Sequence, residues 1–131
     1  MNTPTILLVD DEKDARDTIK NFLSARIESN IHEAENGEDA LKKLKENDID
    51  ILILDIRMPK KSGIHVLDEM KDITTGVDAI VVTAWDSDLV AEECANRGVE
   101  CIPKPLALNE LYEKITKLLK KRDQFIPLQN N

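Results

Sequence analysis

The segment Ile49-Asp50-Ile51-Leu52-Ile53-Leu54-Asp55 is a strongly apolar stretch that ends in an acidic residue. Its aliphatic side chains follow one another without alternating with polar ones, which is typical of a central strand covered by helices on both faces of a parallel sheet. Asp55 is therefore expected at the edge of the core. A carboxylate removed from water is costly unless it is paired, so we expect partners for Asp55 nearby.

Three further apolar runs also end in polar residues. They are residues 6–9, followed by Asp10 and Asp11, residues 80–82, followed by Thr83, and residues 101–103, followed by Lys104. The carboxyl ends of the strands in an open parallel sheet meet at the crevice where ligands bind. We therefore expect three carboxylates, a hydroxyl and an ammonium group to lie together.

The stretches after these runs carry apolar residues at helical spacing. They lie near residues 15–23, 40–44, 64–70, 89–95 and 108–119. A strict alternation of short apolar runs and such stretches predicts βα units joined by right-handed crossovers. The expected fold class is α/β, a (βα)5 doubly wound parallel sheet with helices on both faces. The more polar residues 31–34 suit a strand at the edge of this sheet.

Composition agrees with one domain. A chain of 131 residues can bury roughly two thirds of its unfolded surface, which is enough for one core. The net charge of -8 argues against direct binding of nucleic acid or of an anionic membrane surface. No apolar run is long enough for a membrane span, and no signal peptide is recognisable, so a cytoplasmic protein is expected. The two cysteines, Cys94 and Cys101, are expected to be reduced.

The predicted cluster of Asp10, Asp11 and Asp55 offers hard oxygen ligands, and Mg²⁺ is the cation that fits them best. Without a cation, two carboxylates about 4 Å apart repel by about 4 kcal/mol at an effective dielectric constant near 20. Asparagine at position 10 or 11 should therefore stabilise the metal-free protein. Thr83 and Lys104 supply a hydroxyl and a positive charge suited to a phosphoryl group. The natural reaction is attack of the Asp55 carboxylate on phosphorus, which gives an acyl phosphate.

Taken one at a time, these residues also fit purely structural roles. Asp10 and Asp11 could form a turn that opens a helix, Thr83 could cap a strand, and Lys104 could be a solvated loop lysine. Their occurrence together at four strand ends favours a shared site instead.

In these motifs the chain resembles the receiver domain of two-component response regulators. The similarity covers about residues 4–121. The matching pieces are residues 6–12 (Ile-Leu-Leu-Val-Asp-Asp-Glu), residues 52–59 (Leu-Ile-Leu-Asp-Ile-Arg-Met-Pro), Ser62-Gly63, residues 81–84 (Val-Val-Thr-Ala) and Lys104-Pro105.

The resemblance implies a flavodoxin-like fold with strand order 2-1-3-4-5. It implies that Asp55 accepts a phosphoryl group from a sensor histidine kinase or a histidine phosphotransfer protein, and that a conformational change then reaches a downstream protein target. It assigns the phosphoryl oxygens to Thr83 and Lys104. The magnesium ligands that it implies are Asp10, Asp11, Asp55 and the backbone carbonyl of Arg57.

The chain departs from the family pattern in two ways. Receivers usually carry tyrosine or phenylalanine three residues before the lysine, where this chain has Cys101. We therefore expect the switch to act through residues 83–88 and to leave the fifth strand nearly still. Arg57 and Trp85 are large for positions beside the acceptor, which predicts restricted access of hydrolytic water and a long-lived phosphorylated state.

Residues 1–122 are expected to form the receiver and residues 123–131 a tail or the start of a linker. The chain could be a stand-alone regulator, a phosphorelay intermediate or part of a longer regulator, and its only expected catalysis is its own phosphorylation and dephosphorylation. One alternative is a small phosphatase of the haloacid dehalogenase type, although a second acid is expected where Arg57 stands. The other is a flavodoxin, although the acids at 10–12 would repel a cofactor phosphate.

Overall fold

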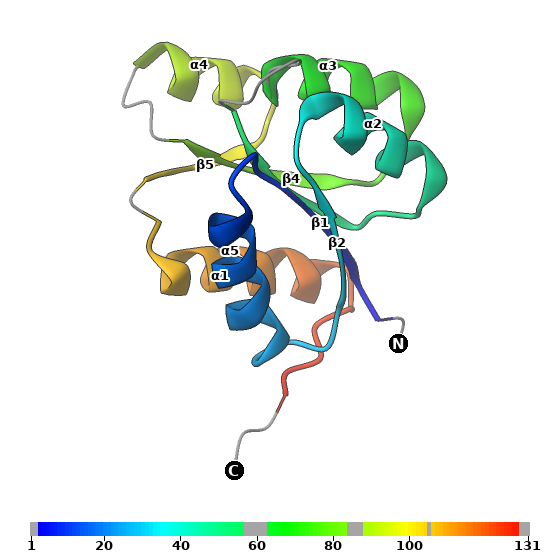
Figure 1. The fold of residues 1–131 in the computed structure, drawn as a ribbon, viewed down its shortest axis with the longest axis vertical. Helices are drawn as coiled ribbons and strands as arrows, with labels where there is room; N and C mark the ends of the chain where they lie inside the picture. The colour runs from blue at the N-terminus through cyan, green and yellow to red at the C-terminus, as the bar shows by residue number, and fades with distance from the viewer. Residues whose placement is uncertain (1–2, 57–62, 84–87, 105, 129–131) are drawn as a thin grey trace.

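The computed structural model of the chain describes residues 3–56, 63–83, 88–104 and 106–128. In these residues, strands and helices alternate from β1 to α5 (Figure 1). The elements are β1 (Thr5–Val9), α1 (Lys13–Ser24), β2 (Asn30–Ala34), α2 (Gly37–Glu46), β3 (Ile51–Asp55), α3 (Gly63–Ile73), β4 (Asp78–Thr83), α4 (Asp88–Asn96), β5 (Glu100–Pro103) and α5 (Leu108–Lys121).

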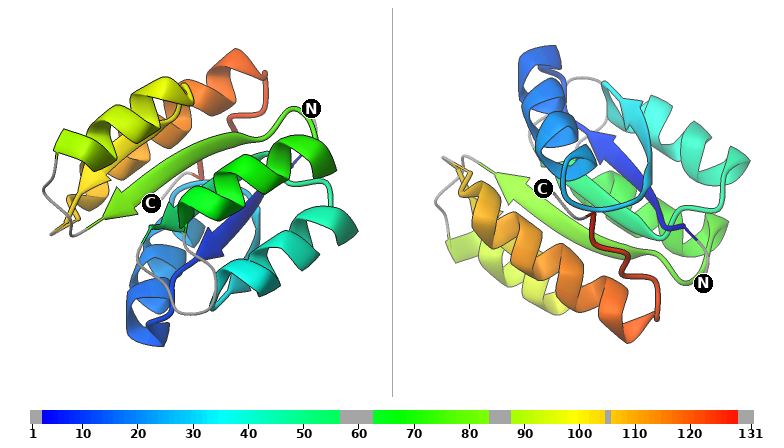
Figure 2. Two further views of the ribbon diagram at one scale, coloured as in Figure 1. Left: turned by 90° about the horizontal axis from the view of Figure 1, so that it is seen from above. Right: turned by 90° about the horizontal axis from the view of Figure 1, so that it is seen from below.

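The strands form one parallel sheet in the order β2-β1-β3-β4-β5. This arrangement confirms both the expected (βα)5 class and the expected strand order. Helices α2, α3 and α4 cover one face of the sheet, and α1 and α5 cover the other (Figures 1 and 2). β2 is an edge strand, and its residues are less buried than those of β1 or β3, as its polar sequence predicts.

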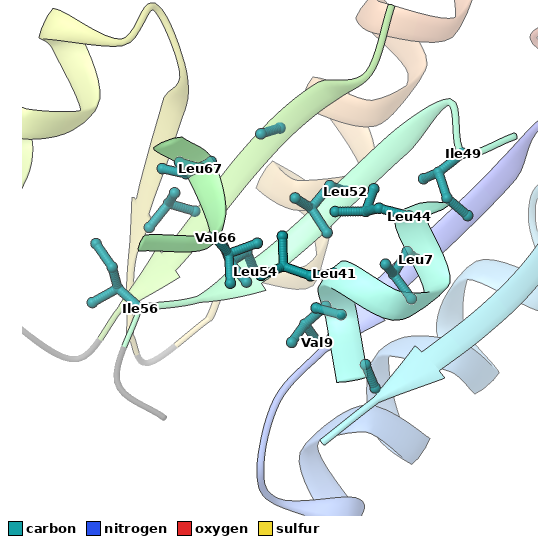
Figure 3. Close-up of a cluster of buried hydrophobic side chains, with 14 of the residues drawn as sticks. Leu7, Val9, Leu41, Leu44, Ile49, Leu52, Leu54, Ile56, Val66 and Leu67 are labelled. Carbon is teal, nitrogen blue, oxygen red and sulfur yellow. The ribbon is translucent and has the colours of Figure 1, made fainter. Parts of the chain in front are cut away.

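Two hydrophobic clusters fill the spaces on either side of the sheet. Alternate residues of each strand point to opposite faces, so Leu52 and Leu54 pack under α2 and α3 while Ile51 and Ile53 pack against α1 and α5. Figure 3 shows the first cluster, where Leu52 and Leu54 meet side chains of α2 and α3. Every residue of β3 is buried, which explains why its sequence is apolar without alternation.

Two helix details follow from local chemistry. The side chain of Asn36 caps α2 by accepting a hydrogen bond from the backbone N–H of Asp39 at 2.9 Å. In α4, Cys94 is buried but Ala95 is exposed, so the expected apolar stripe of this helix does not extend to Ala95. No helix within the described ranges is both long and apolar enough to cross a lipid bilayer.

The segment after α5 folds back onto the loop between α1 and β2. The N–H of Glu28 donates to the carbonyl of Ile126 at 2.9 Å, and the N–H of Leu128 donates to the carbonyl of Arg26 at 2.8 Å. Phe125 packs against the cluster between the sheet, α1 and α5. The chain is therefore anchored to the domain up to residue 128, while the division into domain and tail at residue 122 stays a prediction.

Candidate functional site

The register of the sheet brings the predicted polar residues to one edge. Val9 pairs with Leu54, so the residues that follow them, Asp10 and Asp55, reach the same level at the carboxyl ends of β1 and β3. On the other side of β3, Asp55 pairs with Val82 of β4. The expected convergence at the end of the sheet is therefore present.

Three carboxylates gather at this edge. Asp10, Asp11 and Asp55 each place one carboxylate oxygen so that all three oxygens lie within 4.8 Å of one another. Asp10 and Asp55 are 4% and 7% exposed, whereas Asp11 is exposed. Hard oxygen donors with one member open to water fit Mg²⁺, which binds one or two carboxylates and keeps several of its waters. These residues therefore form a candidate magnesium site.

Asp10 is fixed through all of its polar groups. Its Oδ1 accepts a hydrogen bond from the N–H of Glu12 at 2.9 Å, and its Oδ2 accepts one from Lys104 Nζ at 3.4 Å. Its backbone N–H donates to the carbonyl of Ala34 at 3.2 Å, and its own carbonyl accepts from Arg16 Nη1 at 2.6 Å. These contacts fix the position of the Asp10 carboxylate.

Lys104 extends from the end of β5 across the site. Its Nζ lies 3.1 Å from Oδ2 of Asp55 and 3.4 Å from Oδ2 of Asp10. Partial burial lowers the pKa of Lys104, but the hydrogen bond and the charge of Asp55, helped by Asp10, outweigh burial and raise that pKa overall. The ammonium group is therefore charged at neutral pH and offsets part of the repulsion between the two buried acids.

Thr83 completes the group of residues that the sequence predicts. It is the last residue of β4, is 2% exposed, and accepts the backbone N–H of Lys104 at its carbonyl oxygen at 2.8 Å. This hydrogen bond ties the ends of β4 and β5 together. The structure thus brings Asp10, Asp11, Asp55, Thr83 and Lys104 to the carboxyl edge of the sheet.

Arg57 and Trp85, which were expected to line the site, lie outside the described residues. The expected carbonyl ligand of Arg57 and the slow hydrolysis attributed to both side chains stay predictions. Cys101 lies in β5, partly buried, and packs against the same cluster as Cys94. Its expected effect on the switch is also a prediction.

Two residues near the site have spatial roles that sequence reasoning alone does not explain. Arg16 of α1 donates a hydrogen bond to the backbone carbonyl of Asp10. In the sequence it is recognisable only as a basic residue four positions after Glu12. Gly63 begins α3 so close to β3 that a Cβ atom there would lie 2.7 Å from the Cα of Ile56. The pair Ser62-Gly63 can be recognised in the sequence, but the close approach of α3 to the end of β3 that requires glycine at position 63 cannot.

Asp11→Asn is expected to stabilise the metal-free protein, raising its melting temperature by a few degrees, and to weaken magnesium binding. The reason is that Asp11 is exposed and adds a like charge beside Asp10 and Asp55. Asp10→Asn should gain less, because the Asp10 carboxylate already has Lys104 as a partner. Melting curves in a chelator and in magnesium measure both effects. A lower melting temperature for Asp11→Asn in chelator, with an unchanged response to magnesium, would contradict this expectation.

The two thiols are expected to differ in reactivity. Burial, together with the neighbouring Cys101, raises the pKa of Cys94 to about 12, so this thiol carries little of the reactive thiolate near pH 8. Cys101 is more exposed. Iodoacetamide should therefore modify Cys101 first in the folded protein and both cysteines equally in denaturant, as measured by peptide mass spectrometry. Equal rates in the folded protein would show that Cys94 is accessible.

Comparison with known protein families identifies the class of this domain. Residues 6–116 match the model of the response regulator receiver domain. The match covers most of the chain, and the chain therefore belongs to the response regulator receiver family.

Curated relatives differ in how much of them this chain spans. It is 34% identical over 115 residues to the chemotaxis protein CheY of Bacillus subtilis (strain 168), covering 87% of this chain and 96% of CheY. It is 33% identical over 114 residues to the probable C4-dicarboxylate response regulator DctR of the same organism, covering 86% of this chain and 50% of DctR. It is also 35% identical over 119 residues to a cyclic di-GMP phosphodiesterase of Thermotoga maritima, covering 90% of this chain and 32% of that protein. The chain thus spans half or less of two of these relatives.

Solved structures share the fold over nearly the whole chain. A CheY-like response regulator receiver domain protein from Methanospirillum hungatei JF-1 superposes with a TM-score of 0.84 at 25% identity, covering 94% of this chain and 98% of that one. A two-component response regulator from Clostridium difficile gives a TM-score of 0.84 at 27% identity, covering 92% and 99%. The receiver fold is therefore common to all three proteins.

Proposed function

We propose that this receiver domain accepts a phosphoryl group on Asp55 in a magnesium-dependent reaction. The observation that carries the proposal is that Asp55, at the end of the central strand, shares an acidic cluster with Asp10 and Asp11 and contacts the ammonium group of Lys104. A nucleophile, a cation site and a positive charge for the phosphoryl oxygens thus lie within one site.

The proposed magnesium ligands are Asp10, Asp11, Asp55 and the backbone carbonyl of Arg57. When bound, the cation supplies positive charge that neutralises the carboxylates and the transferring phosphoryl group. An oxygen of the Asp55 carboxylate forms a bond to phosphorus while the bond from phosphorus to the donor imidazole nitrogen breaks. The electron pair of that bond stays on the imidazole. The product is an acyl phosphate on Asp55.

Lys104 and Thr83 are proposed to bind the oxygens of the transferred group. Lys104 Nζ already contacts Oδ2 of Asp55, so a small movement of this side chain would exchange a carboxylate oxygen for a phosphoryl oxygen. The same exchange would release Asp10 from Lys104 and leave its carboxylate to the cation. Phosphorylation would in this way rearrange contacts between the ends of β1, β3 and β5, which is a local change that can be passed to a protein partner.

The proposed partners are a sensor histidine kinase or a histidine phosphotransfer protein as donor and a downstream protein as target. A role as a stand-alone regulator, a relay intermediate or part of a longer regulator, and a cytoplasmic location, belong to the same proposal. The alternatives of a haloacid dehalogenase-type phosphatase and a flavodoxin gain no support, because the family match and the strand-end acids both favour a receiver.

The proposal is tested by intact-mass measurement after incubation with acetyl phosphate and magnesium. The expected result is a gain of one phosphoryl group that disappears when a chelator replaces magnesium. A gain of equal size in the chelator would contradict the role of the cation. Absence of any gain with acetyl phosphate, and with a panel of phosphorylated histidine kinases, would contradict phosphoryl acceptance itself.

A further inference from the structure

Arg16 links the acidic site to the edge of the sheet. It lies in the first turns of α1, where its guanidinium group donates from Nη1 to the carbonyl oxygen of Asp10 at 2.6 Å and from Nε to Oε1 of Glu33 at 3.1 Å. Its side chain is 13% exposed, although most arginines are solvated. A partly buried arginine with two directed contacts holds the groups that it touches in a defined geometry.

Glu33 provides the fixed point for this contact. It lies in β2, where it pairs in register with Leu8 of β1, so its position is set by the sheet. Lys20 contacts its other carboxylate oxygen at 3.2 Å, and Lys43 donates to its backbone carbonyl. Partial burial raises the pKa of Glu33, but the hydrogen bonds from Lys20 and Arg16 lower it by more, so the carboxylate stays ionised at neutral pH.

The carbonyl that Arg16 binds belongs to the peptide between two expected magnesium ligands. Asp10 has further contacts, through Glu12 and Lys104. Asp11 is exposed, and among the residues that the structure describes no side-chain hydrogen bond or ion pair of its carboxylate is found. The direction in which the Asp11 side chain leaves the backbone therefore depends on the orientation of the peptide that Arg16 holds.

We propose that Arg16, held by Glu33, is a positioning residue that orients the Asp10–Asp11 peptide so that both carboxylates face the cation. This inference rests on the proposed magnesium-dependent function and adds a residue that does not touch the cation. Partners that orient ligands in this way typically change metal affinity by about 10- to 100-fold when they are removed. Arg16→Gln is therefore expected to weaken magnesium binding by about tenfold or more.

Whether Arg16→Gln weakens or tightens magnesium binding distinguishes a positioning role of Arg16 from a purely electrostatic one. Removing a positive charge beside a cation site should tighten binding of Mg²⁺ if charge alone matters. Loss of orientation should weaken it. Lys20→Gln is the matched control, because it also removes one positive charge and one Glu33 contact but leaves the contact between Arg16 and Asp10 intact.

The experiment is calorimetric titration of the full chain with magnesium, for wild type, Arg16→Gln, Arg16→Lys and Lys20→Gln. The expected order of affinity is wild type and Lys20→Gln together, then Arg16→Lys, then Arg16→Gln. Lysine keeps the charge but has a single nitrogen for two acceptors, so it restores only part of the affinity. Uptake from acetyl phosphate by Arg16→Gln should be slow in low magnesium and recover toward the wild-type rate as magnesium saturates.

Magnesium affinity in Arg16→Gln that equals or exceeds that of wild type would overturn the inference while leaving the proposed function intact. Equal weakening in Lys20→Gln would also overturn it, because that control spares the Asp10 contact. A wild-type protein that neither binds magnesium nor gains a phosphoryl group would instead contradict the proposed function. If Arg16→Gln does not fold, Arg16→Lys decides: unchanged affinity overturns positioning, and weaker affinity in a protein with normal melting behaviour supports it.

Discussion

Asp55→Asn is expected to abolish phosphoryl uptake from acetyl phosphate, with no mass gain under conditions in which wild type is modified to near completion. An amide nitrogen and a neutral carbonyl oxygen cannot form the acyl phosphate, and the substitution also removes one of the three carboxylates of the acidic cluster. Magnesium affinity should fall at the same time. Intact-mass measurement over time gives the first result and calorimetry the second.

Asp50→Asn serves as the control for this substitution. Asp50 precedes the same central strand at its opposite end, where it accepts the N–H of Thr5 at 2.9 Å and pairs with Arg122 at 3.2 Å. Its replacement is expected to lower the melting temperature but to leave phosphoryl uptake intact. Uptake by Asp55→Asn equal to that of wild type would place the acceptor elsewhere.

Gly63→Ala is expected to lower the free energy of unfolding by about 1–3 kcal/mol and to slow phosphoryl uptake as well. The new Cβ would lie 2.7 Å from the Cα of Ile56 and 3.1 Å from the carbonyl oxygen of Asp55. Both are backbone atoms, which cannot turn aside as a flexible side chain can. The start of α3 and the end of β3 must therefore move apart, and the acceptor moves with its strand.

Gly76→Ala is the matched control for Gly63→Ala. Gly76 has a φ of +78°, and a Cβ there meets no atom within 4 Å, so alanine is strained by its backbone conformation alone. It should destabilise the protein by about 1–2 kcal/mol without changing the rate of phosphoryl uptake. Urea unfolding gives the stabilities, and intact-mass measurement gives the rates. A Gly63→Ala protein with wild-type stability would show that the contact between α3 and β3 relaxes at little cost.

The fold is predictable from the sequence because its determinants are local. The run that ends in Asp55 is apolar since both faces of β3 are buried, and the polar edge strand β2 is equally readable. The five site residues follow from the same logic. Each stands at the end of an apolar run, and parallel strands end at one edge, so no knowledge of side-chain packing is needed to bring them together.

Contacts between elements distant in sequence are not predictable in this way. Arg16 reaches Glu33 only because β2 lies beside β1 in a register that puts Glu33 opposite Leu8. The hydrogen bonds between residues 126–128 and the loop after α1 likewise depend on where α5 ends relative to that loop. The contacts of Lys104 with the carboxylates of Asp10 and Asp55 also join separate strand ends, while its expected binding of phosphoryl oxygens stays a prediction.

The proposed function rests on Asp55 being the phosphoryl acceptor, and chemical trapping tests this most directly. Sodium borohydride reduces an acyl phosphate on aspartate to homoserine and leaves free carboxylates unchanged. Wild type treated with acetyl phosphate, magnesium and then borohydride is expected to contain homoserine at position 55, as read from the fragment masses of the peptide that includes residues 51–55. An unmodified Asp55, with homoserine at another position or at none while the intact protein carries a phosphoryl group, would contradict the role of Asp55 as the acceptor.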